Sequence, residues 1–199
     1  MRIIVFCVVT VFVLKISLFA TDDSNNHRYY PLNVGDNWEY FLGDTTQNSL
    51  LKFTIVSVDS INGLHFFTTK QEWFKRDSLT HTQEYFQKVD NGFVITAVNK
   101  KVPFFQIQHP CDGSVRFSEE IAKRYAISLN EDMVEHLRSF RASFTFIDFD
   151  SGTHSLWEFR NKKEVSKFAE NIGLVYMKND NIQLTLKVAT IKGKKFRLL

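Results

Sequence analysis

The sequence predicts a mainly antiparallel β domain, formed as a curved sheet, half-barrel or barrel of about 8–10 strands, with one or two short helices between residues 118 and 140. Three observations support this fold class. Several segments alternate apolar and polar residues, as half-buried strands do. Tight-turn dipeptides separate some of these segments. Apolar residues recur at helical spacing only between residues 118 and 140.

The first half of the chain shows two hairpin signals. Asn62-Gly63 predicts a type I′ turn, because both central positions of that turn need a positive φ. Asp90-Asn91-Gly92 predicts a second tight turn. β-Branched and aromatic residues, which favour strands, fill the segments on either side. The expected strands cover residues 38–42, 51–58, 64–74, 83–89 and 93–98.

The second half begins with the helical stretch. Asn130 is a suitable N-cap, and Glu131 and Asp132 follow in the first turn, where the helix dipole favours acids. Strands are expected after it over residues 141–149, 156–160 and 182–189, and Phe144 and Phe146 share one face of the first. The apolar residues at helical spacing are Ile121, Tyr125, Met133, Leu137 and Phe140.

Residues 1–20 have the layout of a secretory signal peptide. Arg2 precedes an apolar run from Ile3 to Leu14, and Ala20 offers a small residue for cleavage. The run of about twelve residues is shorter than the roughly twenty that a membrane-spanning helix needs. We therefore expect an exported protein, periplasmic or extracellular, with a flexible leader over residues 21–28, a single β-rich domain over 29–199 and no transmembrane span after cleavage.

Removal of the signal peptide changes both charge and cysteine content. Two of the 25 basic residues lie in it, so 23 remain against 22 acidic residues, a balance that does not indicate nucleic-acid binding. Only Cys111 remains, which excludes an internal disulfide. Cys111 follows Pro110 and is expected in a turn, with a nucleophile or an intermolecular bridge as alternatives.

A basic cluster lies near the end of the sequence. We expect a solvated last strand and tail, and a phosphate or membrane-surface site is the alternative. The cluster consists of Lys187, Lys192, Lys194, Lys195 and Arg197.

Aromatic residues form 15% of the chain and often stand side by side, as in Phe66-Phe67. Neighbours in a strand point to opposite faces, so such pairs make both faces apolar. Either the strands lie between a core and a covering element such as residues 118–140, or a concave face holds an apolar ligand. An ordinary core rich in phenylalanine is the simplest explanation. For a ligand-lined hollow, the candidate lining residues are Phe66, Trp73, Tyr85, Phe93, Phe144 and Phe146.

The sequence contains no recognised catalytic, phosphate-binding or dinucleotide-binding motif. Asp148, Asp150 and Gly152 resemble the start of a calcium loop, but the next acid is Glu158, so a hairpin turn is expected instead. The six histidines show no zinc-site spacing. We expect no catalytic residue, no cofactor and no metal.

Two segments together suggest a family. Residues 30–40 read Tyr-Pro-Leu-Asn-Val-Gly-Asp-Asn-Trp-Glu-Tyr, and residues 168–176 read Phe-Ala-Glu-Asn-Ile-Gly-Leu-Val-Tyr. The pair resembles an uncharacterised group of secreted bacterial β-rich domains, which open with Tyr-Pro-Leu, a Gly and Trp-x-Tyr and place Gly-Leu-Val before the last strand. The resemblance spans about residues 29–190 and implies the compartment and the fold, without an activity. We further expect the first and last strands to pair and close the sheet.

These observations leave three functional hypotheses. The first is an exported, non-catalytic binding domain of the bacterial envelope, which holds an apolar or lipid-like ligand. The second is a structural or protein-interaction domain of the envelope without a ligand cavity. The third is a hydrolase. An empty apolar cavity would favour the first, a filled core with an exposed aromatic patch the second, and a cleft with converging acids and a histidine the third.

Overall fold

The structure is a computed structural model that describes residues 28–43, 49–113 and 116–199. The expected signal peptide and residues 21–27 of the leader lie outside these ranges. The two helices are α2 (Glu119–Arg124) and α3 (Glu131–Ser139). The strands are β1 (Asn37–Leu42), β2 (Ser49–Ile61), β3 (Leu64–Lys75), β4 (Ser78–Asp90), β5 (Phe93–Ala97), β6 (Phe105–Pro110), β7 (Arg141–Phe149), β8 (Gly152–Arg160), β9 (Val165–Ala169), β10 (Gly173–Lys178), β11 (Gln183–Ile191) and β12 (Lys194–Phe196).

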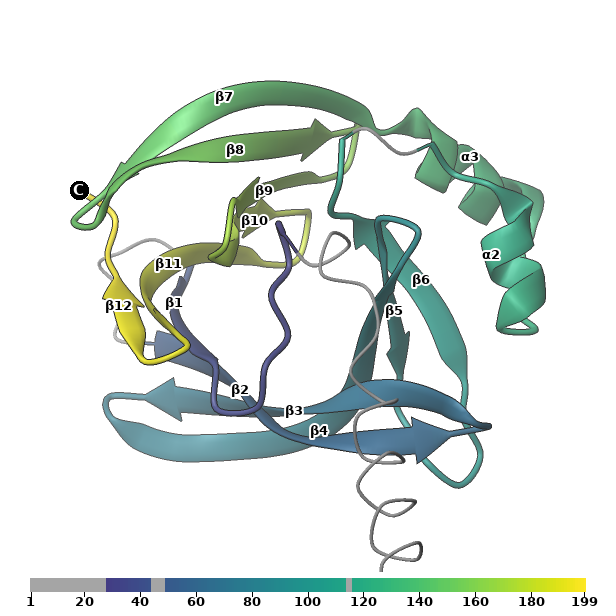
Figure 1. Cartoon of the computed structure of the whole chain (residues 1–199), viewed down its shortest axis with the longest axis horizontal. Helices are drawn as coiled ribbons and strands as arrows, with labels where there is room; N and C mark the ends of the chain where they lie inside the picture. Colours follow the sequence, from purple (N-terminus) through teal and green to yellow (C-terminus); the bar gives the residue numbers. More distant parts are fainter. Residues whose placement is uncertain (1–27, 44–48, 114–115) are drawn as a thin grey trace, which may run out of the picture.

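The strands form one antiparallel sheet, strongly curved, as expected (Figure 1). Their order is β6-β5-β4-β3-β2-β1-β11-β10-β9-β8-β7, and β12 pairs with β11 beside this path. The sheet has 12 strands, more than expected, because β6, β9, β10 and β12 have only three to six residues each and too few alternations to be recognised. The fold class is therefore confirmed as an open curved sheet that does not close into a barrel.

The expected pairing of the first strand with the strand near the C-terminus is confirmed. Tyr40 of β1 lies opposite Leu186 of β11, and Leu42 lies opposite Leu184. The expected closure is wrong, because the two edge strands, β6 and β7, do not pair with each other in the described part of the chain. β1 also pairs with β2, and β11 also pairs with β10. The β1–β11 pair therefore joins two halves in the middle of the sheet, and β6 and β7 form its edges.

Both sequence-predicted hairpins are present. Asn62 and Gly63 have φ values of 52° and 78°, and Asn91 and Gly92 have φ values of 52° and 73°. These are the positive values that a type I′ turn requires, and asparagine and glycine adopt them at low cost.

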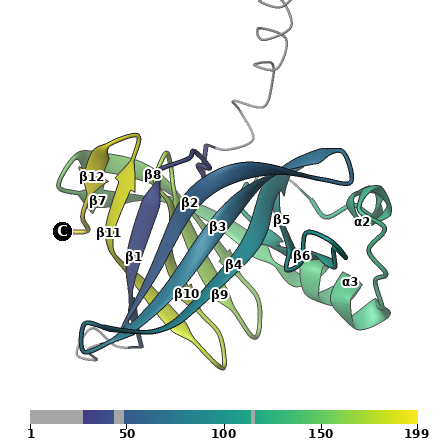
Figure 2. The same ribbon diagram turned by 90° about the horizontal axis from the view of Figure 1, so that it is seen from below.

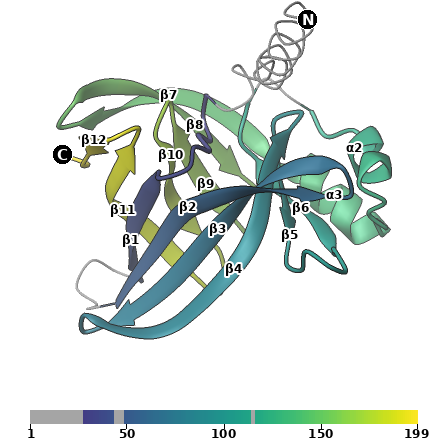
Figure 3. The same cartoon turned by 60° about the horizontal axis from the view of Figure 1, so that its bottom comes forward.

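The helices cover one face of the sheet at the β5–β6 end, away from β12 (Figures 2 and 3). Asn130 caps α3 as expected, since its side chain accepts a hydrogen bond from the Met133 N–H at 2.8 Å. Asp90 on β4 holds α2 by accepting hydrogen bonds from Arg124 at 2.7 Å and from the Tyr125 hydroxyl at 2.6 Å. The helical segment is thus fixed to the sheet by polar contacts with Asp90 as well as by apolar packing.

The aromatic pairs lie between two apolar clusters. Phe66 is fully buried in the cluster beneath the helices, while Phe67 packs against the main core on the other face. Phe86 lies in the same cluster beneath the helices, and its neighbour Tyr85 faces the interior of the curved sheet. A covering element therefore accounts for these two pairs, as one of the sequence-based alternatives proposed.

Residues 28–33, which we call the plug segment, cross one end of the curved sheet ahead of β1 (Figures 1 and 2), where Tyr29 and Leu32 are buried. The Tyr30 ring lies 6.2 Å from the ring of His109 and 5.9 Å from that of Phe168, measured between centroids. Leu32 is buried in the main core. In the described ranges, no helix is long and apolar enough to cross a membrane.

Candidate functional site

The six residues predicted to line a ligand hollow do not meet in one cavity. Phe66 and Phe93 are buried in the cluster beneath the helices, and the Trp73 ring lies 4.8 Å from that of His81. Tyr85 faces an interior cavity. The remaining two, Phe144 and Phe146, lie on the outermost strand, β7, and are half exposed or more. The sequence alone could not show that these aromatic residues lie in separate regions of the fold.

The cavity beside Tyr85 is small, with a volume of about 50 Å³. Its walls are mostly apolar or aromatic, with polar atoms from Thr69, Gln87 and Tyr30. The Gln87 amide donates a hydrogen bond to the Tyr30 hydroxyl at 2.9 Å and accepts one from Thr69 at 3.0 Å. Ligand pockets for drug-sized molecules usually exceed roughly 300 Å³, so this cavity has room for one or two water-sized groups.

The two segments that carry the family resemblance pack against each other around the plug segment. The Trp38 indole donates a hydrogen bond to the Ile172 carbonyl at 2.6 Å, and the Tyr40 hydroxyl donates one to the Leu174 carbonyl at 2.9 Å. Gly173 has a φ of +97°, and a Cβ there would lie 3.3 Å from Pro31. In this fold these residues have an architectural role, because the two hydrogen bonds join β1 to the segment at the start of β10.

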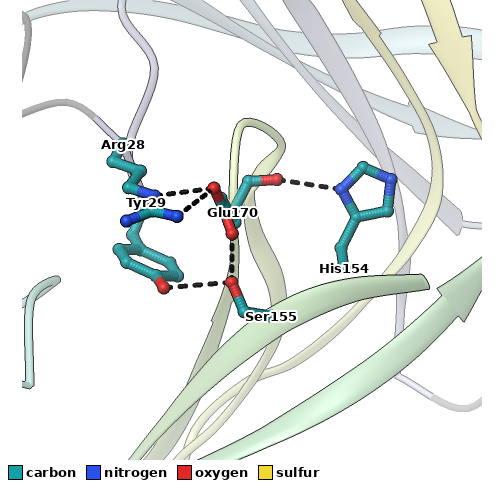
Figure 4. A network of polar contacts seen from close by, with 5 residues as sticks. All are labelled: Arg28, Tyr29, His154, Ser155 and Glu170. Atoms are coloured by element: carbon teal, nitrogen blue, oxygen red, sulfur yellow. Dashed lines mark hydrogen bonds and ion pairs between the residues drawn. The ribbon is translucent and has the colours of Figure 1, made fainter.

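A polar network lies where the plug segment leaves the sheet (Figure 4). Arg28 donates a hydrogen bond to one carboxylate oxygen of Glu170 at 2.6 Å, and Ser155 donates to the other oxygen. The Tyr29 hydroxyl lies 3.1 Å from the Ser155 hydroxyl. The Ser155 and Arg28 hydrogen bonds hold the pKa of Glu170 below its usual range, so this carboxylate is charged and both its oxygens are engaged.

His154 lies beside this network with a defined orientation. Its Nδ1 is 3.2 Å from the Glu170 carbonyl oxygen, which can only accept, so Nδ1 carries the proton. Its Nε2 lies 3.2 Å from the Ser151 hydroxyl. Ser151 lies in the β7–β8 turn, three residues from His154, so the contact is local. It fixes the turn and presents the histidine edge to solvent.

These residues line an open cleft of about 1030 Å³ beside the β11–β12 hairpin, which we call the basic cleft. Its charged lining residues are the Arg28–Glu170 pair and the lysines at 192 and 194. The sequence identified the basic cluster but not Arg28 and Glu170, because only the fold brings positions so far apart together. The lining residues are Arg28, Pro31, Leu32, Asn33, Ser151, His154, Glu170, Asn171, Ile191, Lys192, Lys194 and Phe196.

A second surface lies on β7. Phe144 and Phe146 are on the same face, as expected, with ring centroids 5.5 Å apart. Phe144 also lies 5.0 Å from Trp157, the residue opposite it on β8. These rings continue the core-facing side of the sheet to its edge, where they are 50% and 65% exposed. They form an exposed aromatic patch beside a largely filled interior.

The outer edge of β7 is paired only at its end, as far as the described residues show. The Leu199 N–H donates to the Asp148 carbonyl at 3.4 Å, and the Asp150 N–H donates to the Arg197 carbonyl at 3.0 Å. The backbone groups of even-numbered β7 residues therefore point away from β8, because strand direction alternates with a period of two. By this alternation, Phe144 and Phe146 present both exposed rings and outward N–H and C=O groups.

Other candidate sites from the sequence are explained by structure. The Asp148 carboxylate accepts from Thr153 at 2.6 Å, and Asp150 accepts from the Arg197 N–H at 3.0 Å, so the expected hairpin turn is confirmed. Cys111 is buried, which raises the pKa of its thiol, and it donates to the Gly92 carbonyl at 3.4 Å. The described ranges contain no group of three or more side chains suited to hold a metal ion.

Comparisons with known proteins add little to this geometry. No family model and no curated protein matches the chain. A crystal structure of a "putative lipoprotein" from Parabacteroides distasonis is similar over 79% of this chain and 96% of that one, with 12% sequence identity and a TM-score of 0.41. A likeness at this TM-score supports no conclusion about function.

Proposed function

We propose that this protein is an exported, non-catalytic domain of the bacterial envelope that binds a partner protein by strand addition at β7. The observation that carries the proposal is the edge over residues 141–147, which no described strand pairs with and where outward backbone groups coincide with two exposed phenylalanines. Unpaired strand edges bind extended peptides through main-chain hydrogen bonds, and alternate side chains give specificity. The signal-like layout of residues 1–20 supports the proposed export.

The chain's own tail indicates what kind of segment this edge accepts. Leu198 forms an antiparallel bridge with Phe149 and packs against the main core. An added strand over residues 141–147 would continue this pairing and place its alternate side chains beside Phe144 and Phe146. We therefore infer that the partner supplies an extended segment with apolar residues at alternate positions.

An apolar ligand inside the sheet has weaker support. The interior cavity of about 50 Å³ cannot hold an acyl chain while Tyr30 and Leu32 occupy the interior. Such a ligand would have to displace the plug segment, which is held by the Arg28–Glu170 pair. A fluorescent fatty-acid probe tests this alternative, and saturable binding lost on substitution of Tyr85 would favour it over strand addition.

Site-specific photocrosslinking in the native envelope tests the proposal. A photoreactive amino acid at Thr145, which is exposed on β7, should give a discrete adduct with one other protein. The same amino acid at Val58, which is exposed on β2 outside the proposed surface, is the matched control. Phe144→Lys with Phe146→Lys should abolish the adduct at Thr145 and leave the melting temperature unchanged.

The adduct also identifies the partner. A single foreign protein whose crosslinked peptide alternates apolar and polar residues would support strand addition. A species of twice the chain mass would show that β7 joins two copies and would overturn the proposal of a foreign partner. The proposal also fails if Thr145 and Val58 give the same adducts, or if neither gives any.

A further inference from the structure

The geometry points to a second site: the basic cleft binds an oxyanion of the phosphate class through Lys192 and Lys194. This inference concerns the β11–β12 hairpin and does not depend on β7. Both lysines line the cleft, and in the described ranges neither ammonium group has an ion-pair partner. Two unpaired cations on one wall of a cleft attract a compact, doubly charged anion.

The acids near the cleft are already engaged. Both carboxylate oxygens of Glu170 accept hydrogen bonds, from Arg28 and Ser155. Asp36, which is almost fully buried, accepts from the Asn33 amide and from the Lys192 N–H, each at 2.7 Å. These two acids orient the walls of the cleft, and neither pairs with a lysine side chain of the hairpin. Three cations thus stand against two acids whose oxygens are occupied.

Neutral polar groups complete the site. His154 and Ser151 form one side of the cleft, and the amide-bearing Asn33 and Asn171 lie on the plug-segment side. The side-chain N–H groups of Asn33 and Asn171 can donate hydrogen bonds to phosphate oxygens, while the lysines supply the charge. The Asp36 contact to the Lys192 backbone fixes the turn that carries one of the lysines. The site is therefore built on a hairpin that the buried Asp36 anchors.

The opposite face of the same hairpin differs in a way that supplies a control. Lys195 and Arg197 point to another surface depression, lined also by Glu39 and Lys187. There the acid is available to a cation, since Lys187 lies 3.6 Å from the Glu39 carboxylate. Adjacent residues of β12 thus face surfaces of different charge balance, because neighbours in a strand point to opposite sides.

The test titrates the protein with inorganic phosphate and follows the His154 imidazole signals by NMR. We expect a saturable shift in the wild type. The variant Lys192→Asn with Lys194→Gln should raise the Kd at least about tenfold, because two charge-assisted contacts are lost. Asparagine tolerates the positive φ of 48° at position 192, so the turn is retained. The control, Lys195→Gln with Arg197→Gln, removes the same charge and should keep the wild-type Kd.

Vesicles distinguish the source of the phosphate group. Binding to phosphatidylglycerol vesicles that soluble phosphate competes away, with phosphatidylcholine vesicles unbound, would assign a lipid headgroup. Saturable phosphate binding without vesicle binding would assign a soluble anion. Either result supports the site if Lys192→Asn with Lys194→Gln loses the binding and the control, Lys195→Gln with Arg197→Gln, keeps it. Equal loss in both variants, or no saturation below about 100 mM phosphate, would overturn it.

Discussion

The two edges of the sheet have the same aromatic character and opposite surroundings. On β6, the Phe105 ring lies 5.5 Å from Phe66 and 5.6 Å from Tyr125 of the helical insertion. On β7, Phe144 contacts both Phe146 and Trp157, and no described helix covers the two phenylalanines. Phenylalanine is thus a core residue at one edge and a surface residue at the other. The difference is that the helices cover the aromatic face beside β6, while the phenylalanine rings on β7 stay exposed.

The largest expected effect contrasts Phe66→Ala with Phe146→Ala. Phe66 is fully buried, so its truncation should leave a cavity and lower the free energy of unfolding by about 3–5 kcal/mol. Phe146 is 65% exposed, and its truncation should change that free energy by no more than about 0.5 kcal/mol. Urea denaturation of both variants measures the difference. Similar losses would mean that β7 is covered like β6.

Proline substitutions test the direction of the β7 backbone. The Thr145 N–H points toward β8, so Thr145→Pro should remove a ladder hydrogen bond and lower the free energy of unfolding by about 1–3 kcal/mol. The Phe146 N–H points outward, and proline is tolerated at edge positions that do not donate to the sheet. Phe146→Pro should therefore cost clearly less in thermal denaturation. If Phe146→Pro cost more than Thr145→Pro, the N–H groups that point outward would belong to the odd-numbered residues.

A pH dependence is expected where β6 meets the other half of the sheet. Burial against Tyr30 and Phe168 lowers the pKa of His109 to about 4. The unfolded chain takes up this proton near pH 6.5, whereas the folded chain takes it up only near pH 4. The free energy of unfolding is therefore unaffected by His109 above pH 6.5 and falls as the pH decreases from 6.5 to 4. The loss is at most about 3 kcal/mol.

The control for this effect is His109→Phe. The substitution removes the titrating group and keeps an aromatic ring beside Phe168, while His136, whose pKa burial also lowers, titrates equally in both proteins. The difference in unfolding free energy between wild type and variant should therefore change between pH 6.5 and 4. A constant difference would contradict the buried, neutral state of His109.

The smallest expected effect concerns the anchor of the covered edge. Tyr125→Phe removes the hydrogen bond from the hydroxyl to the Asp90 carboxylate and leaves the ring contacts intact. We expect a loss of about 1.5 kcal/mol in unfolding free energy, and faster amide hydrogen exchange in α2. Retention of wild-type exchange rates would show that apolar packing alone holds the helix on the sheet.

Local signals in the sequence predicted much of the fold. The Asn-Gly turns, the Asn130 cap and the alternation in β11 depend on neighbouring residues, so they could be recognised directly. The separation of the sheet edges could not be predicted, because the exposure of Phe144 depends on where α2 and α3 pack. The basic cleft was equally inaccessible, since Arg28 and Glu170 are distant in sequence.

The pairing of β1 with β11 has a consequence for the order of events in folding. Asn37 lies opposite Thr190, so the central seam of the sheet cannot form until the chain has been synthesised as far as Thr190. Contacts of such high sequence separation slow folding. Until then the aromatic residues of the first five strands lack part of their core, and chains with exposed apolar surface aggregate readily. We therefore expect a requirement for a chaperone that holds the nascent chain until its last strands arrive.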